Sequence, residues 1–251
     1  MRSLGLSLII FGLVLGGIFL GTLLRRALPQ KHLSKDAQDA VRLGIGLIAT
    51  IAGLVVGLLI AAAKNSFDTK SGQVTQITAD IILLDTLLAQ YGPEAQPIRK
   101  QMRGEMGPFV ARIWRDNEVS KAEPFAASAA AEQVYLEIQA MSPSDGLQRA
   151  LQARAAQVVT NVAQLRLLLF AEKSNTIPVP FLVVLVFWLV IIFVSFSLFS
   201  DMNATVLISL CTFALSVSAA IYLILELNDP FSGLMGVSSQ PLLNALGPMT
   251  P

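Results

Sequence analysis

Four long runs of apolar residues, none of which contains a charged side chain, dominate the pattern of the chain. These runs are residues 4–24, 43–63, 181–199 and 204–225. Each is close to the roughly 20 helical residues that cross a hydrocarbon core of about 30 Å. The first run is longer than the apolar part of a signal peptide, and no small-residue cleavage site follows it. We therefore expect four retained membrane-spanning helices, with the cleaved leader as the alternative for the first.

The spacing of the runs predicts two helical hairpins. The first pair is joined through residues 25–42 and the second through residues 200–203, and residues 64–177 separate the two pairs. With two crossings in each hairpin, both termini and the central region lie on one side of the membrane. The predicted parts are a first hairpin over residues 1–63, an extramembrane helical domain over 64–177, a second hairpin over 178–225 and a short C-terminal tail over 226–251.

The central region has the pattern of a packed helical domain. Its first apolar residues recur at alternating steps of three and four, which is the spacing of a helix seam. Gly92-Pro93 is expected to end this helix. The seam residues are Val74, Ile77, Ile81, Leu84 and Leu88.

Two further helices are expected after Pro93. The first has an apolar face, and its Gly104, Gly107 and Pro108 predict a kink or a break. The second is rich in alanine and covers about residues 125–141. The apolar residues of the first are Ile98, Met102, Met106, Phe109, Ile113 and Trp114.

A last helix of the domain leads towards the third apolar run. Ser142 is the expected N-cap and Pro143 the expected first helical residue. Its apolar positions include Leu147, Leu151, Val158, Val162, Leu165 and Leu169. Because no alternating strand pattern competes with these helices, the predicted fold class is all-α.

Composition and charge agree with an integral membrane protein. Hydrophobic residues make up 54% of the chain and charged residues only 14%, against about 25% charged residues in soluble domains. The net charge of +1 predicts no basic surface for a nucleic acid. The single Cys211 and the single His32 exclude an intrachain disulfide and a multi-histidine metal site. We expect neither a metal nor a cofactor.

The sequence offers no catalytic constellation. Asp80 and Asp85 are five residues apart, a spacing that does not put two side chains on one helix face. We expect the carboxylates of the domain to form a solvated surface with scattered ion pairs. A phosphate-binding glycine loop, a nucleophile elbow and a kinase signature are all absent from the sequence. The sequence therefore predicts that the protein is not an enzyme.

Small residues recur along the second apolar run. Ala49, Gly53, Gly57 and Ala61 follow one another at every fourth position, and Gly46 and Thr50 lie on a neighbouring stripe. Such spacing lets helices approach closely in lipid, within one protomer or between protomers. The alternative is that Gly46, Thr50, Gly53 and Gly57 face a pore and expose carbonyls and one hydroxyl to an ion. The first run has the same four-residue spacing of small residues, between Gly12 and Gly16 and between Gly17 and Gly21.

The four runs contain no ionisable residue that could relay protons, which argues against a proton-coupled transporter. If the second run lines a pore, ion selectivity must come from pore radius, backbone dipoles or charged residues outside the bilayer. Arg42 and Lys64, at the two ends of this run, are candidates for such charges.

The tail contains two possible helix starts. Asp229 can cap a helix that has Pro230 at its first position. Ser239 can cap a second short helix that Gly247 ends. The local pattern alone predicts turns at the membrane surface.

The layout and the tail together resemble those of a known family. A hairpin, a long helical domain, a second hairpin and a short tail are the arrangement of bestrophins, and the tail motif is similar to the acidic Asp-Pro-Phe-Gly segment that follows their last membrane helix. The residues of this motif are Glu226, Asp229, Pro230, Phe231 and Gly233. The chain is more similar still to the uncharacterised bacterial bestrophin-like family, over residues 28–34 (LPQKHLS), residues 41–67, Trp114 and the tail.

The resemblance to bestrophins implies a pentameric anion channel in the cell (inner) membrane, with its pore lined by the second membrane helix and its termini and helical domain in the cytoplasm. Two features depart from that pattern. The second apolar run has no proline or aromatic residue for a bulky constriction, and the acidic run of a calcium clasp is absent because residues 234–237 are apolar or glycine. We therefore expect no calcium site.

Charge and resemblance give opposite orientations. The loop over residues 25–42 and the other side of the membrane each carry five Lys or Arg residues near the helix ends, and the charge rule slightly favours the short loop as cytoplasmic. Two functions remain open. One is a homo-oligomeric passive channel, for anions rather than cations, and the other is a non-conducting membrane scaffold whose helical domain binds a protein partner.

Overall fold

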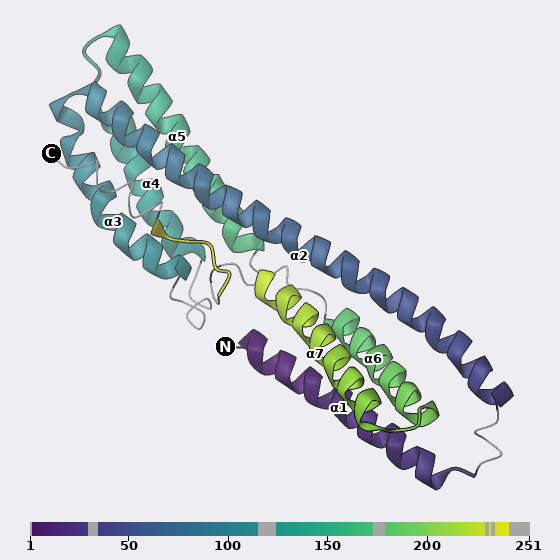
Figure 1. Cartoon of the computed structure of the whole chain (residues 1–251). Coiled ribbons are helices and arrows are strands. Elements are labelled where there is room, and N and C mark those ends of the chain that lie inside the picture. The colour runs from purple at the N-terminus through teal and green to yellow at the C-terminus, as the bar shows by residue number, and fades with distance from the viewer. Residues whose placement is uncertain are drawn as a thin grey trace. The chain divides into compact units, whose positions relative to one another are not determined.

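The computed structural model of the chain is built from helices. It describes residues 2–29, 35–114, 124–172, 179–228, 231 and 234–240, and within these ranges no strand occurs. The elements are α1 (Arg2–Ala27), α2 (Lys35–Tyr91), the short 3₁₀ helix η2 (Pro93–Ala95), α3 (Gln96–Trp114), α4 (Pro124–Ala140), α5 (Gly146–Glu172), α6 (Val179–Phe199) and α7 (Ala204–Leu227) (Figure 1). The all-α prediction is confirmed.

Four of these helices are long and apolar enough to cross a membrane. They are α1, α2, α6 and α7, and their apolar parts contain the four predicted runs. The connection over residues 200–203 lies between α6 and α7, as predicted. Asn203 caps α7, since its side chain accepts a hydrogen bond from the main-chain nitrogen of Val206 at 2.9 Å. The prediction of four apolar helices of spanning length is confirmed.

The chain divides into two compact units, and α2 contributes to both. The first unit is Met1–Phe67 with Thr176–Asp229, and the second is Asp68–Asn175 with Pro230–Pro251. At about 1.5 Å per residue, the 57 residues of α2 extend about 85 Å, nearly three times the thickness of a hydrocarbon core. A single helix thus carries the second apolar run and the first seam of the central region, which the sequence pattern treats as separate elements.

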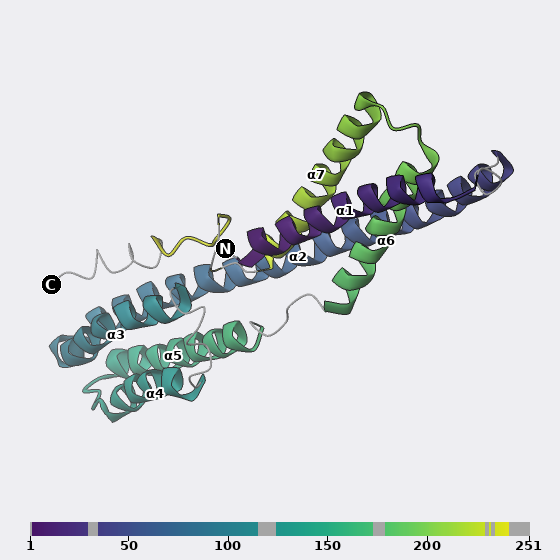
Figure 2. The same cartoon turned by 90° about the horizontal axis from the view of Figure 1, so that it is seen from below.

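In the first unit, α1 packs against α6 and α7 (Figure 1, and turned in Figure 2). The core combines one face of each helix with the apolar part of α2. Its fully buried residues include Val14, Leu185, Ala214, Ile221 and Ile224. Two glycines of α1 make the close approach to α6 possible, since a Cβ at Gly17 or Gly21 would press on the α6 backbone.

The second unit buries the seam predicted for residues 74–88. Val74, Ile77, Ile81, Leu84 and Leu88 are all at most 5% exposed. Around Leu84 and Leu88 they form one cluster with residues of α3, α4 and α5, and around Ile77 a second cluster with Val110, Val162 and Leu169. The helix ends at Tyr91, and Gly92 follows with φ = 130°, a conformation that favours glycine.

The later helices differ from two expectations. The predicted break in α3 does not occur, because the helix continues through Gly104–Pro108, while the alternative of a kink stays a prediction. Helix α5 begins at Gly146 rather than at Pro143. Asp145 provides the cap instead, because its Oδ1 accepts a hydrogen bond from the nitrogen of Gln148 at 2.7 Å, while Gln148 Oε1 accepts one from the nitrogen of Ser144 at 2.7 Å. The two bonds satisfy free amides at and just before the helix start, as in a capping box, although Gln148 binds the nitrogen of Ser144 and not that of the cap residue.

Two carboxylates of α2 are buried in the second unit, and one of them binds a side chain of α3. Asp85 is 9% exposed and receives two hydrogen bonds from Arg99, Nε to Oδ1 at 2.7 Å and Nη2 to Oδ2 at 2.9 Å. Asp80 is 8% exposed and accepts a hydrogen bond from Gln76 at 3.1 Å. The expectation of solvated carboxylates is therefore wrong for these two residues, since packing of the seam carries them inside.

Candidate functional site

The apolar half of α2 presents two different faces. Ile45, Ala52, Leu59 and Ala63 are buried, and they recur at the seven- and four-residue steps that keep side chains on one side of a helix. The residues on the other side are exposed within the described protein. They include a row of leucines at positions 43, 47, 54 and 58 beside the stripe of small residues.

The predicted pore or packing residues lie together on this exposed half. Gly46, Thr50, Gly53 and Gly57 are all exposed, and a Cβ built at any of the three glycines would meet no described atom within 4 Å. The Thr50 hydroxyl donates a hydrogen bond to the carbonyl oxygen of Gly46 at 2.9 Å. Within the described protomer, the stripe therefore serves no helix packing, which leaves open a pore and a contact with another chain.

Charged residues stand at the two ends of this apolar run. Arg42 forms an exposed ion pair with Asp39 at 3.8 Å. The ammonium nitrogen of Lys64 lies 5.9 Å from the centre of the Phe67 ring, within the range of a cation–π interaction. Both cations that the sequence suggested as outer charges thus have a local partner.

Polar contacts tie the ends of the first unit together. At one end, the hydroxyl of Ser3 donates a hydrogen bond to Glu226 Oε2 at 2.7 Å, and Glu226 is only 3% exposed. At the other end, the Arg25 guanidinium binds the carbonyl oxygen of Ser200 and the carboxylate of Asp201. The start of α1 therefore lies beside the end of α7, and the end of α1 beside the turn between α6 and α7.

The tail motif divides between the two units. Glu226 is buried near the end of α7 in the first unit, where it accepts the hydrogen bond from Ser3. Phe231 and Val237 pack in the second unit against the cluster that contains Val74, Ile77 and Val162. Asp229, Pro230 and Gly233 lie outside the described residues, as does the segment that Ser239 was expected to cap. The proposed cap at Asp229 therefore stays a prediction.

The described residues contain no group of three or more His, Cys, Asp or Glu side chains that could hold a metal ion. The polar contacts that sequence reasoning missed are Arg25 with Asp201 and Asp85 with Arg99. The first could have been anticipated from the predicted hairpins, because the connections over residues 25–42 and 200–203 are expected on the same side of the membrane; in the structure Arg25 lies in the last turn of α1. For the second the sequence gives no signal beyond opposite charges.

Comparison with known proteins places these features in a family. A model of the bestrophin-like domain matches residues 12–242. Two structures of mutants of a bacterial bestrophin homologue from Klebsiella pneumoniae are similar in fold. One has a TM-score of 0.64 at 12% identity, covering 94% of this chain and 96% of that chain, and the other a TM-score of 0.69 at 13% identity, covering 96% and 97%. No curated protein gives a significant match. Since the family model covers all but the ends of the sequence, this membrane protein belongs to the bestrophin-like family.

Proposed function

We propose that the chain forms a homo-oligomeric passive ion channel in the cell (inner) membrane, with α2 lining the pore. The observation that carries this proposal is the stripe of Gly46, Thr50, Gly53 and Gly57, which is exposed in the described protomer, with no described atom within 4 Å of a Cβ built at its three glycines. A helix of spanning length that leaves backbone and one hydroxyl uncovered has the surface that an ion path needs. Family membership supports the same function.

We further propose a pentamer that conducts anions in preference to cations. This finer assignment rests on what a bestrophin-like architecture implies, because the apolar half of α2 has neither acidic nor basic side chains. Selectivity would then come from pore radius and backbone dipoles, since no fixed charge lies along the stripe. The cations at the ends of the run, Arg42 and Lys64, would add a favourable potential for anions.

The proposed topology has two hairpins and a helical domain outside the bilayer. Its support is the pairing of ends within the first unit, where Ser3 meets Glu226 and Arg25 meets Asp201. The length of α2 also agrees, because a helix of about 85 Å extends well beyond a core of about 30 Å. Reporter fusions at Gln30 and Pro251 would test which side of the membrane each of these residues occupies. We expect Pro251 to lie in the cytoplasm and Gln30 on the opposite side.

The first test is the native mass in a mild detergent. A pentamer has five times the protomer mass of 26.9 kDa, and a particle of that mass would justify flux measurements in anion-loaded vesicles. A monomer or dimer that persists across mild detergents could not enclose the pore. That outcome would favour the alternative function, a non-conducting scaffold whose helical domain binds a protein partner.

The second test places a cysteine on the stripe. In a Cys211→Ala background, Gly53→Cys should react with a charged thiol reagent, and the reaction should block anion flux. Ile208→Cys is the control, because this position of α7 is 66% exposed but lies outside the proposed pore. Gly53→Leu should change conductance while the oligomer stays intact. If Gly53→Leu instead disrupts the oligomer, the stripe packs protomers together.

A further inference from the structure

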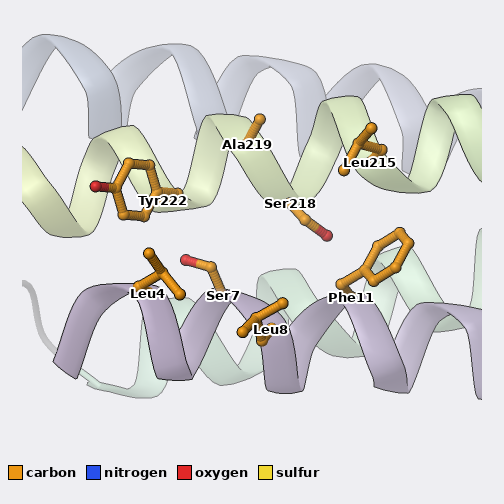
Figure 3. A pocket seen from close by; sticks show the side chains of 8 residues that line it. All are labelled: Leu4, Ser7, Leu8, Phe11, Leu215, Ser218, Ala219 and Tyr222. Carbon is orange, nitrogen blue, oxygen red and sulfur yellow. The ribbon is translucent and has the colours of Figure 1, made fainter. Parts of the chain in front are cut away.

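A groove runs along the seam between α1 and α7, inside the first unit. Figure 3 shows its two walls, with α1 providing Leu4, Ser7, Leu8 and Phe11 and α7 providing Leu215, Ser218, Ala219 and Tyr222. We call this feature the α1–α7 groove. Its cavity volume is about 310 Å³. Because Leu4 and Phe11 are seven residues apart in one helix, the groove is about 10 Å long.

The groove exists because small residues lie between larger ones. Ser7 and Ser218 are 7% and 5% exposed, and they lie deep between the leucines, Phe11 and Tyr222. The Ser7 hydroxyl already donates a hydrogen bond to the carbonyl oxygen of Ser3 at 2.8 Å. The Ser218 hydroxyl has no hydrogen-bond partner among the described residues, although a rotation would let it bond to its own helix, as the neighbouring Ser216 does at 3.0 Å.

Three kinds of occupant can be compared on size and polarity. Ordered water needs two to four polar partners, and most of the lining side chains are hydrocarbon. A helix 10 Å across has a volume on the order of 800 Å³ over this length, so most of it would lie outside the groove. An extended peptide would leave its backbone unpaired in the hydrocarbon region. A single hydrocarbon chain meets none of these objections.

We propose that the α1–α7 groove binds one acyl chain of a bilayer phospholipid. Both walls belong to helices of membrane-spanning length, so lipid is the medium that surrounds the groove. Van der Waals contact is the driving force here, because burial from water plays no part within lipid.

The polar groups give the chain a direction. Ser7 and Tyr222 lie towards the end where Ser3 bonds to Glu226. Phe11 and Leu215 form the opposite end, deeper in the apolar part of both helices. The ester end of the lipid therefore lies towards Tyr222, and the methyl end towards Leu215.

The test uses the full-length protein in vesicles that contain phosphatidylcholine with a diazirine in its acyl chain. After photolysis, the labelled peptides are mapped by mass spectrometry. We expect labels on residues 4–11 and 215–222. Ala219→Phe places a ring in the groove and should lower this labelling about fivefold, since the ring takes the space of the chain. Ala220→Phe is the matched control, because Ala220 does not line the groove.

Two further variants keep the test decisive. Leu8→Trp blocks the groove from the opposite wall at a residue that is 60% exposed, and should lower labelling even if Ala219→Phe fails to fold. Ser218→Ala should leave labelling unchanged, because an acyl chain accepts no hydrogen bond. Labelling that falls equally in Ala220→Phe, that persists in both blocked variants, or that requires the Ser218 hydroxyl would overturn the proposal.

Discussion

The Ser197 hydroxyl on α6 donates a hydrogen bond of 2.8 Å to the main-chain carbonyl oxygen of Ile18 on α1. Ser197 is completely buried, and the contact brings a side chain of one spanning helix against the backbone of another. Gly21 permits this approach, since a Cβ there would collide with Ser197 Oγ and with the Val194 carbonyl. The close contact of α1 and α6 is an example of small residues that allow helix association in lipid.

We expect Gly21→Ala to destabilise the protein by about 1–3 kcal/mol, because the added methyl group overpacks a tight backbone contact. Gly12→Ala is the control. It adds the same methyl group to the same helix, but nothing lies within 4 Å of that position, and alanine is the better helix former. Thermal unfolding in detergent measures both variants. Equal melting temperatures for the two variants would show that the Gly21 contact does not limit stability.

A second prediction concerns the hydrogen bond between Ser3 and Glu226. Ser3→Ala removes a donor from a carboxylate that is 3% exposed, and we expect a loss of about 1–2 kcal/mol. Ser216→Ala is the matched control, since that exposed hydroxyl bonds only within α7, to the carbonyl oxygen of Thr212. Chemical unfolding in mixed micelles compares the two variants. A loss in Ser216→Ala as large as that in Ser3→Ala would contradict a special role for the Glu226 contact.

The elements that the sequence predicts best are those governed by one strong physical rule. The four spanning helices follow from charge-free apolar length, and the buried seam of residues 74–88 follows from its periodicity. The continuity of α2 is harder to predict because its pattern changes from uniformly apolar to amphipathic near Lys64, although no helix breaker lies there. The start of α5 is hard to predict because Ser142 and Asp145 are both residue types that cap helices, and the structure uses Asp145, whose Oδ1 accepts a hydrogen bond from the nitrogen of Gln148.

The candidate site is partly predictable for a different reason. The sequence identifies Gly46, Thr50, Gly53 and Gly57 by their size and spacing, but periodicity alone does not say which face of a helix its own protomer covers. Folding leaves this stripe open and covers Gly21, although both helices carry glycines four residues apart. Whether a glycine is covered depends on which other helix packs against it. For Gly21 this is α6, whose residues are far away in the sequence.

A third prediction addresses the ion pair between Asp85 and Arg99, whose side chains are 13% and 12% exposed. Asp85→Ala leaves a largely buried guanidinium without its two bonds, and we expect a loss of about 2–3 kcal/mol, towards the lower end for a broken buried pair because some water reaches it. Asp39→Ala is the control, because its pair with Arg42 is 72% and 64% exposed and should contribute less than about 1 kcal/mol. Urea unfolding of the two variants provides the comparison.

The same pair should be insensitive to alkaline pH. The hydrogen bonds that Arg99 donates to Asp85 raise the pKa of Arg99 above its ordinary value; burial acts in the opposite direction, and the charge of Asp85 adds a smaller upward shift. A cation whose pKa is raised by folding contributes its full stability below the unfolded pKa and loses it only as the pH rises through the folded one. Both values lie far above neutrality, so the difference between the parent and Asp85→Ala should be constant from about pH 7 to about pH 10. A difference that shrinks over this range would mean that another group controls the contact.

A fourth prediction concerns the end of α4, which is capped by a side chain from α5. Gln152 Nε2 donates to the carbonyl oxygens of Ile138 at 2.8 Å and Met141 at 3.0 Å. Carbonyls at a helix end have no partner within the helix, so Gln152→Leu should cost about 1–2 kcal/mol although it keeps the size of the side chain. Gln157→Leu is the control, because Gln157 is exposed and bonds only to Asn161 on its own helix. Hydrogen exchange should then rise at residues 134–140 in the Gln152 variant alone, and an equal rise in both variants would remove the cap as its cause.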